Sequence, residues 1–513
     1  MNKEKFYVTT PIYYVNDIPH IGHAYTTVAA DVVARYKRLK GFEVFFLTGT
    51  DEYGQKVEKA ASAAGVSPKE LADKVVERFK SLWKVLNISN DDFIRTTEPR
   101  HKAAVLDIWE KVKAGGDIYL GEYEDWYCTP CENFLTKAQL EDEKCPDCGR
   151  EVDKLKEKSY FFKLSEYQDY LVKFIKDNPG FISPKIRENE VLSFISEGLR
   201  DLSISRTAFS WGVGVPEDPA HVMYVWFEAL MNYLSGSGYP VKKDFWPPDV
   251  QLIGKDILRF HTVFWPAFLK SAGLEPPKKV FAHGWWTVEG KKMSKSIGNV
   301  VDPFKVASDY GVDQFRFFLL REVPFGKDGD FSVNALEGRI NSELANDLGN
   351  LLSRTLSMVA KYRDEVIPEF KSTEEDIKNA KDSGFGFFSP DFKDTFDEHI
   401  CEVRFHLALE QLWEVVRAMN AYVDKSAPWT LAKEGKDKEL DLVLFNLLEG
   451  LRITALYLYP FMPESALRIR KSLGIEGSIS AVDFDKDILF RGETIGGLKT
   501  DKGSPLFPRI EKE

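Results

Sequence analysis

Pro19-His20-Ile21-Gly22-His23 stands between an apolar, strand-like run, Phe6-Tyr7-Val8, and a helical pattern from Ala24 to Lys40. A second apolar run, Phe42–Leu47, follows, and Asp51-Glu52 comes just after it, so residues 5–47 predict a β-α-β unit. Two histidines around a glycine at the start of this helix lie where free N–H groups and the helix dipole favour phosphate. Gly22 would let a nucleotide approach the backbone closely. The predicted fold class is therefore α/β, with a Rossmann-like parallel sheet that binds its ligand beyond the strand carboxyl ends.

A second motif, Lys292-Met293-Ser294-Lys295-Ser296, lies between Gly290 and Gly298. It places two ammonium groups beside serine hydroxyls, which suits a triphosphate. By charge alone it would be a solvated basic loop. Matched with the paired histidines, it favours an ATP site.

Composition limits the classes of function. The chain has 513 residues, 43% of them hydrophobic and 29% charged, which predicts an ordinary globular protein of two to four domains. No apolar leader follows Met1, and no apolar run approaches the length of a membrane span. We therefore expect a cytoplasmic protein. The net charge of −11 argues against nonspecific nucleic-acid binding, although cations confined to one face would still allow a specific RNA partner.

Four of the five cysteines form two Cys-x-x-Cys pairs, Cys128 with Cys131 and Cys145 with Cys148, separated by 13 residues. Four thiolates can hold one zinc ion tetrahedrally at about 2.3 Å and leave no position open for water, so the predicted zinc is structural. Disulfides are the alternative, which the missing secretory signal disfavours. The fifth, Cys401, is predicted to be a small buried residue.

Both phosphate-directed motifs resemble the signature sequences of class I aminoacyl-tRNA synthetases, and their surroundings resemble the methionyl-tRNA synthetase family. The segments Pro11–Asn16, Ile253–Asp256 and Ala427–Trp429 share this resemblance, which runs from about Phe6 to Ile510. It implies an enzyme that activates L-methionine with ATP and Mg²⁺ to methionyl-adenylate plus pyrophosphate. Methionine would then pass to the 3′ end of tRNA(Met), initiator tRNA included. No DNA or membrane partner is expected. Because the chain ends soon after Pro508-Arg509-Ile510, we expect a monomer.

The resemblance implies a catalytic domain split by a zinc-bearing connective insertion and followed by an all-α anticodon-binding bundle. The predicted parts are the first catalytic half at 1–115, the insertion at 116–216, the second catalytic half at 217–287, the Lys-Met-Ser-Lys-Ser loop with a linking, stem-contact region at 288–340, and the helical domain with its tail at 341–513. We expect the sheet to resume at His221–Phe227 and to include Val250–Ile253 and Val280–His283.

Site residues follow from matching positions. The predicted ATP-binding residues are His20, Gly22, His23, Gly254, Asp256, His283, Gly284, Lys292, Met293, Ser294, Lys295 and Ser296. Four of these, His20, His23, Lys292 and Lys295, are the predicted catalytic residues. The predicted methionine pocket comprises Ile12, Tyr14, Asp51, Trp226, Ala229, Tyr233, Ile257, Phe260, His261 and Trp265, with Asp51 receiving the ammonium. The aromatic members would equally suit an ordinary core.

The predicted anticodon residues are Asn350, Arg354 and Trp429. Asn350 and Arg354 are four residues apart, hence on one helix face, and Trp429 follows Pro428, where an indole could stack on an unpaired base. A packed helix cap is the alternative for Trp429.

The proposed chemistry needs no general base, because the attacking carboxylate is already an anion; positioning and charge neutralisation must supply catalysis. A small nucleotidylyltransferase would also carry His-x-Gly-His, but it would leave the cysteines and the helical half unexplained. A noncatalytic zinc-dependent RNA-binding protein would leave both phosphate motifs unexplained. Leucine, isoleucine and valine synthetases carry a large editing insertion, for which residues 116–216 are too few.

Overall fold

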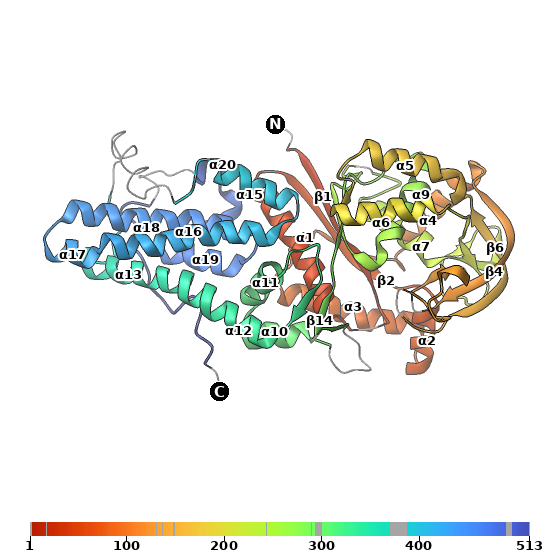
Figure 1. Ribbon diagram of the computed structural model, residues 1–513, viewed down its shortest axis with the longest axis horizontal. Helices are drawn as coiled ribbons and strands as arrows, with labels where there is room; N and C mark the ends of the chain where they lie inside the picture. The colour runs from red at the N-terminus through yellow and green to blue at the C-terminus, as the bar shows by residue number, and fades with distance from the viewer. Residues whose placement is uncertain are drawn as a thin grey trace. The chain divides into compact units, whose positions relative to one another are not determined.

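The computed structural model describes residues 3–16, 18–129, 131–135, 137–146, 149–242, 244–288, 290–292, 300–369, 387–488 and 495–511. It divides into two compact units (Figure 1). Unit 2 comprises residues 5–30 and 44–285, and unit 1 comprises residues 1–4, 31–43 and 286–513. Helix α1 (Ile21–Leu39) contributes to both units.

Unit 2 is built on a six-stranded sheet with the order β3-β2-β1-β12-β13-β7. Its strands are β1 (Lys5–Tyr14), β2 (Glu43–Asp51), β3 (Asp92–Arg95), β7 (Ile182–Ser183), β12 (Val250–Gly254) and β13 (Val280–His283). The pairs β1–β12, β12–β13, β13–β7 and β2–β3 are parallel, which confirms the predicted fold class. Tyr7 and Val8 are fully buried, as expected for a central strand covered on both faces.

The helices of unit 2 begin and end where local sequence signals place them. They are α2 (Gln55–Ala64), α3 (Pro68–Val85), α4 (Pro99–Ala114), α5 (Gln168–Asp177), α6 (Lys185–Ser196), α7 (Val225–Ala229), α8 (Asn232–Gly236) and α9 (Trp265–Ser271). At the start of α3, Ser67 and Glu70 form a capping box with Pro68 between them. A π-helical turn, Phe260–Phe264, precedes α9.

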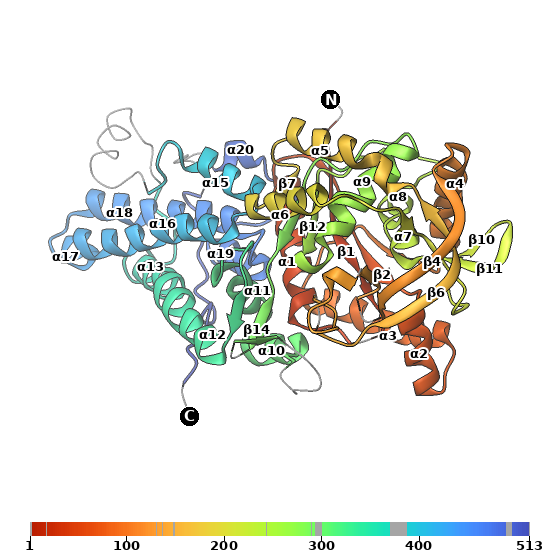
Figure 2. The ribbon, with the colours of Figure 1, turned by 45° about the vertical axis from the view of Figure 1, so that its right-hand side comes forward.

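The predicted insertion contains a separate antiparallel sheet with the order β5-β4-β6-β8. Its members are β4 (Ile118–Cys128), β5 (Asn133–Leu135), β6 (Asp153–Phe162) and β8 (Leu202–Ser203). Figure 2 shows β4 and β6 as a long paired ribbon, in register from Ile118 opposite Phe162 to Tyr127 opposite Asp153. One strand from this same segment, β7, joins the six-stranded sheet instead.

The prediction that the main sheet resumes at 221–227 was wrong. Residues of β11 (Asp218–Met223) pair antiparallel with β9 (Ser205–Arg206) and β10 (Gly214–Val215) in a small sheet of their own. Helix α7 then begins at Val225. A fully apolar run this short cannot be assigned to strand or helix from its pattern alone.

Unit 1 is mainly helical among its described residues. A three-stranded sheet, β15-β14-β16, contains β14 (Trp286–Val288), β15 (Lys291–Lys292) and β16 (Gly329–Phe331). The helices are α10 (Pro303–Tyr310), α11 (Val312–Arg321), α12 (Val333–Arg339), α13 (Asn350–Arg363), α15 (Phe392–Cys401), α16 (Phe405–Ser426), α17 (Pro428–Lys433), α18 (Asp437–Leu458), α19 (Pro463–Ser472) and α20 (Phe484–Asp487). Figures 1 and 2 show α16 and α18 side by side, with α17 at their end.

Two further observations bear on the sequence analysis. No helix among the described residues is both long and apolar enough to cross a membrane. Cys401, predicted to be buried, is exposed at the end of α15, where Lys37 Nζ lies 3.5 Å from its Sγ, so that prediction was wrong. The apolar periodicity around it belongs to its neighbour Ile400, which is fully buried.

A buried ion-pair cluster holds part of unit 1 together. Asp31, on α1, accepts from Arg35 Nε at 2.7 Å and from Arg316 NH2, on α11, also at 2.7 Å. Arg316 is fully buried and also donates to the carbonyl oxygens of Pro460 and Phe461. Both guanidinium groups thus share one carboxylate.

Asp31→Ala is expected to lower the free energy of unfolding by about 3–5 kcal/mol, because it leaves two buried guanidinium groups without their carboxylate. Thermal and denaturant unfolding will measure this loss. Asp177→Ala is the matched control, since it breaks an exposed pair with Lys173 and should cost less than about 1 kcal/mol. Equal effects of the two substitutions would contradict the assigned role of Asp31.

Candidate active site

The start of α1 carries the paired histidines. The backbone N–H of His20 donates to Nδ1 of His23 at 3.0 Å, and that of Gly22 donates to Nδ1 of His20 at 3.1 Å. The centroids of the two imidazole rings are 3.9 Å apart. Because each Nδ1 accepts a hydrogen bond, the proton of each neutral ring is on Nε2. The sequence therefore builds two imidazoles with the same tautomer at a helix N-terminus.

Burial, and then the neighbouring His20, hold the pKa of His23 well below its ordinary value. His23 is neutral at physiological pH and serves as a hydrogen-bond donor rather than as a cation. Tyr13 and Phe79 contact its ring edge to face, at centroid distances of 4.8 and 5.2 Å. These contacts fix the ring's orientation.

The predicted adenosine-side residues gather beside the same helix turn. Gly254 and His283 are register partners on β12 and β13, and His283 Nε2 lies 2.6 Å from the hydroxyl of Thr26 in α1. Asp256 is close by, since a Cβ built on Gly254 would lie 2.6 Å from Asp256 Oδ1. Trp285 Nε1 donates to Asp256 at 3.0 Å. The carboxyl ends of the parallel strands β12 and β13 thus lie beside the first turns of α1.

The predicted methionine pocket is an aromatic cluster. Trp226 and Phe260 stack with their centroids 3.8 Å apart, and Trp226 meets His261 edge to face. The ring Nδ1 of His261 donates to the carbonyl of Ile257, so its Nε2 accepts from the hydroxyl of Tyr233 at 2.7 Å. Burial lowers the pKa of His261 to about 4, so this imidazole is neutral.

The remaining pocket candidates border the same buried cluster. Trp265 is fully buried, Ala229 nearly so, and Ile12, Tyr14 and Ile257 are partly buried against it. The buried atoms Tyr14 Oη and Trp226 Nε1 have no hydrogen-bond partner among the described residues. Buried polar atoms are rarely left unpaired, so a polar ligand group beside them could satisfy these two.

Asp51, at the end of β2, is 4% exposed and accepts from the N–H of Tyr53 at 3.4 Å. Burial, and then the carboxyl of Glu228, raise its pKa well above the ordinary value. A bound ammonium would offset both effects. The carboxyl of Asp51 is therefore a candidate partner for a cationic ligand.

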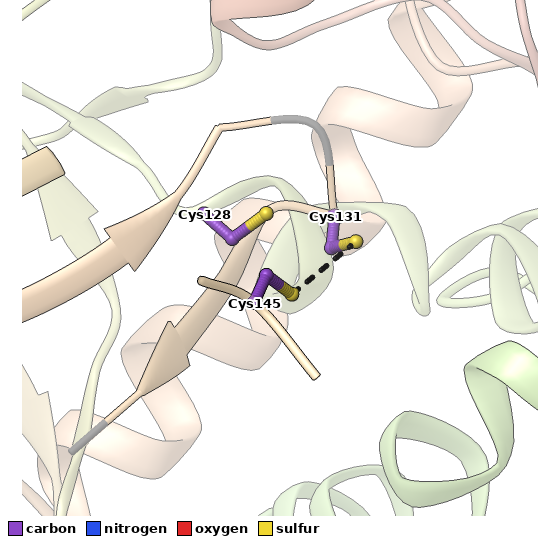
Figure 3. Close-up of side chains that lie close together, drawn as sticks. All are labelled: Cys128, Cys131 and Cys145. Carbon is purple, nitrogen blue, oxygen red and sulfur yellow. Dashed lines mark hydrogen bonds between the residues drawn. The ribbon is translucent and has the colours of Figure 1, made fainter. Parts of the chain in front are cut away.

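Three cysteines converge at the tip of the β4–β6 ribbon (Figure 3). The Sγ atoms of Cys128, Cys131 and Cys145 all lie within 4.8 Å of one another, and those of Cys131 and Cys145 are 3.9 Å apart. Sulfurs around a tetrahedral zinc with bonds of about 2.3 Å would be about 3.8 Å apart. The fourth predicted ligand, Cys148, lies outside the described residues. The cluster can hold a metal ion.

The three predicted anticodon residues lie in the helical unit. Asn350 is exposed at the start of α13, and Arg354, one turn later, donates to Asp424 near the end of α16 at 2.8 Å. Trp429 follows in α17 and is 47% exposed. Of the second motif, Met293, Ser294, Lys295 and Ser296 lie outside the described residues, as does the side chain of Lys292.

Comparisons with known proteins identify the family of this chain. The family model described as "tRNA synthetases class I (M)" matches residues 6–156 and 150–356. A methionine–tRNA ligase of Caldanaerobacter subterraneus subsp. tengcongensis is 50% identical over 520 residues, covering 100% of this chain and 80% of the relative. That of Bacillus subtilis is 47% identical, covering 99% of this chain and 78% of the relative. This chain belongs to the methionyl-tRNA synthetase family.

A solved structure supports the family at the level of the fold. Mycobacterium tuberculosis methionyl-tRNA synthetase in complex with methionyl-adenylate is similar with a TM-score of 0.92 and 45% identity, covering 99% of this chain and 100% of that chain. Its free-state structure is similar with a TM-score of 0.86 and 41% identity, covering 100% of this chain and 99% of that chain.

Sequence reasoning missed several buried or charged groups that border the candidate site. Glu228 and His101 form a fully buried pair with 3.0 Å between Glu228 Oε2 and His101 Nε2. Lys56 lies over the ring of Tyr14 at 4.4 Å. An acid inside the apolar run Tyr224–Leu230 was a usable signal for Glu228, because a buried carboxyl needs a partner. No local pattern marks His101 or Lys56.

Gly22→Ala is expected to raise the KM for ATP roughly 10–100-fold, because the new Cβ would lie 2.9 Å from Cε1 of His20 and displace that ring. ATP–pyrophosphate exchange measures the change. Gly338→Ala in α12 is the control, since a Cβ there meets no atom within 4 Å. An unchanged KM for ATP in Gly22→Ala would show that His20 does not contribute to binding the nucleotide.

Proposed function

We propose that this synthetase activates L-methionine with ATP, releasing pyrophosphate, and then transfers methionine to the 3′ end of tRNA(Met). The observation that carries the proposal is the 50% identity with a methionine–tRNA ligase over the whole chain. The stacked aromatic cluster and the buried carboxyl of Asp51 support it, since aromatic rings suit a thioether and a buried carboxylate suits an ammonium. Methionine-dependent ATP–pyrophosphate exchange tests it, and exchange with leucine, isoleucine or valine but not methionine would refute it.

In the proposed reaction, the methionine carboxylate attacks the α-phosphorus of ATP, and the bond to the bridging oxygen of pyrophosphate breaks. His20 and His23 donate their Nε2 protons in hydrogen bonds to phosphate oxygens, while Lys292 and Lys295 neutralise the leaving pyrophosphate. Gly254, Asp256, His283 and Gly284 hold the adenosine. Mg²⁺ bound with ATP supplies further positive charge. The catalytic domain is proposed to be residues 1–115 and 217–287, the insertion 116–216, the linking region 288–340, and the anticodon-binding domain 341–513.

We further propose that the protein is a cytoplasmic monomer whose tRNA partners include the initiator tRNA. Asn350, Arg354 and Trp429 are proposed to contact the anticodon, in keeping with their place on the helical unit.

Asp51→Asn is expected to raise the KM for methionine roughly 10–100-fold, because it removes the charge that pairs with the substrate ammonium. In the parental protein, methionine affinity should fall as pH drops through the raised pKa of Asp51, since a protonated carboxyl cannot pair with ammonium. The variant should lose that pH dependence. Exchange kinetics against pH measure both, with the exposed Asp177→Asn as control; an unaltered KM in Asp51→Asn would contradict the assignment.

We propose one structural zinc per chain, held by Cys128, Cys131, Cys145 and Cys148. Replacing Cys128 and Cys145 by Ser together should remove the metal, unfold the insertion locally and abolish aminoacylation. Metal analysis and limited proteolysis measure these effects. Cys401→Ser, at an exposed cysteine outside the cluster, should keep the zinc; fully active protein with no metal would contradict the site.

Trp429→Ala is expected to weaken tRNA(Met) charging by roughly 1–3 kcal/mol, the value of one base stacked on an aromatic side chain. Amino-acid activation should continue at the parental rate, and discrimination against other anticodons should shrink. Leu467→Ala, at another exposed apolar residue, is the control. Equal losses in exchange and charging, with a lowered melting temperature, would instead make Trp429 a packing residue.

A further inference from the structure

A chain of hydrogen bonds runs through three helices of unit 2. Glu228 Oε2 lies 3.0 Å from His101 Nε2, and His101 Nδ1 lies 3.1 Å from the hydroxyl of Ser235. That hydroxyl donates to the carbonyl oxygen of Asn232 at 3.2 Å. Glu228 and His101 are both fully buried, on α7 and α4. None of these hydrogen bonds is needed to explain the reaction of the family.

The directions of these bonds fix where the protons are. A carbonyl only accepts, so Ser235 donates its single proton to Asn232 in this arrangement, and its oxygen then accepts from Nδ1–H of His101. A neutral His101 then has a bare Nε2, which can only accept. The hydrogen bond at 3.0 Å therefore requires a proton on Glu228 Oε2.

The electrostatic surroundings agree with this placement. Among the described residues, His101 is the only ion-pair partner of Glu228, and Glu228 Oε1 has no partner. Burial lowers the pKa of His101 to about 3, so the ring does not supply a cation. Burial, and then Glu52, raise the pKa of Glu228 well above its ordinary value.

The groups that face Glu228 leave it no compensating charge. Glu52 is already paired with Arg95, which donates to both of its oxygens at 2.6 and 3.0 Å. Asp51 and Tyr53 complete this side, and an ionised Glu228 would raise the pKa of both. Tyr14, on β1, is the remaining neighbour that senses Glu228. The cation on this side, Lys56 over the ring of Tyr14, lowers the pKa of Asp51, whereas Glu52 is the charged group that acts on the pKa of Glu228.

We propose that Glu228 stays protonated and donates that proton to His101, so that Asp51, and not Glu228, supplies the negative charge that pairs with the substrate ammonium. This inference rests on the proposed function, because it assumes that methionine binds beside Asp51. Glu228 is a positioning residue: its neutral carboxyl keeps a second charge away from Asp51 and locks His101 in place. An ionised Glu228 would give the pocket an additional charge that a single ammonium cannot balance.

Infrared spectroscopy tests the protonation state without any substrate. The difference between the parental protein and Glu228→Gln at neutral pH should contain the C=O stretch of a protonated carboxyl. A carboxylate stretch in its place would overturn the proposal. Because methionine is absent, this outcome does not depend on the proposed function, which methionine-dependent exchange by the parental protein tests separately.

Kinetics supply the second readout. The amide of Glu228→Gln can donate to His101 as the protonated carboxyl does, so the KM for methionine should stay within about threefold of the parental value. A larger rise would overturn the proposal. Glu228→Leu is the matched variant; it leaves His101 Nε2 without a donor and should melt at a lower temperature than Glu228→Gln, whereas equal melting temperatures would also count against it.

Should Glu228→Gln fail to fold, the parental protein still gives an answer. The protein has eight histidines and can be labelled with ¹⁵N-histidine. The signals of His101 are then assigned by their loss in His101→Gln. A neutral ring with its proton on Nδ1 supports the proposal. An imidazolium, or a ring with its proton on Nε2, would overturn it.

Discussion

The parallel pairing of β1 with β12 is the constraint on which the candidate site depends. Val8 lies opposite Val250, so the pair joins segments 242 residues apart and closes around the entire insertion. Because all parallel strands point the same way, their carboxyl ends bring the start of α1, Asp51 and Gly254 to one edge. Such a distant contact carries a large loop-closure cost, which the full burial of both faces of the sheet must offset.

The three buried carboxyl groups at this edge of the sheet have three different kinds of partner. Glu52 is paired with Arg95, Glu228 shares a hydrogen bond with a neutral imidazole, and Asp51 has only one backbone N–H among the described residues. Burial raises the pKa of both Asp51 and Glu228, the two carboxyls that have no cationic side chain within hydrogen-bond distance among the described residues. The same edge also holds His23, which burial keeps neutral. The site is thus prepared for a substrate that carries charges of both signs.

The sequence predicted the β-α-β unit because each strand begins with an apolar run and the helix repeats apolar residues at helical spacing. The strands β1 and β2 only extended further than expected, to Tyr14 and Asp51. It predicted the cysteine cluster because ligand spacing is local. It could not predict that β11 pairs with β9 and β10 outside the main sheet, since the pattern of a strand does not name its partners. Nor could it predict the Glu228–His101 pair, which joins residues 127 apart. The roles of the candidate site residues remain predictions that rest on resemblance and on their gathering at the sheet edge.

The π-helical turn at Phe260–Phe264 has a consequence for how this family can vary. A π turn holds one residue more than an α turn, so deleting one residue there would restore regular winding and rotate everything before it by about 100° relative to α9. Phe260 would then leave the face of Trp226, and His261 would leave Tyr233. Substitutions can alter the pocket gradually, but a change of length at this turn would dismantle it in one step.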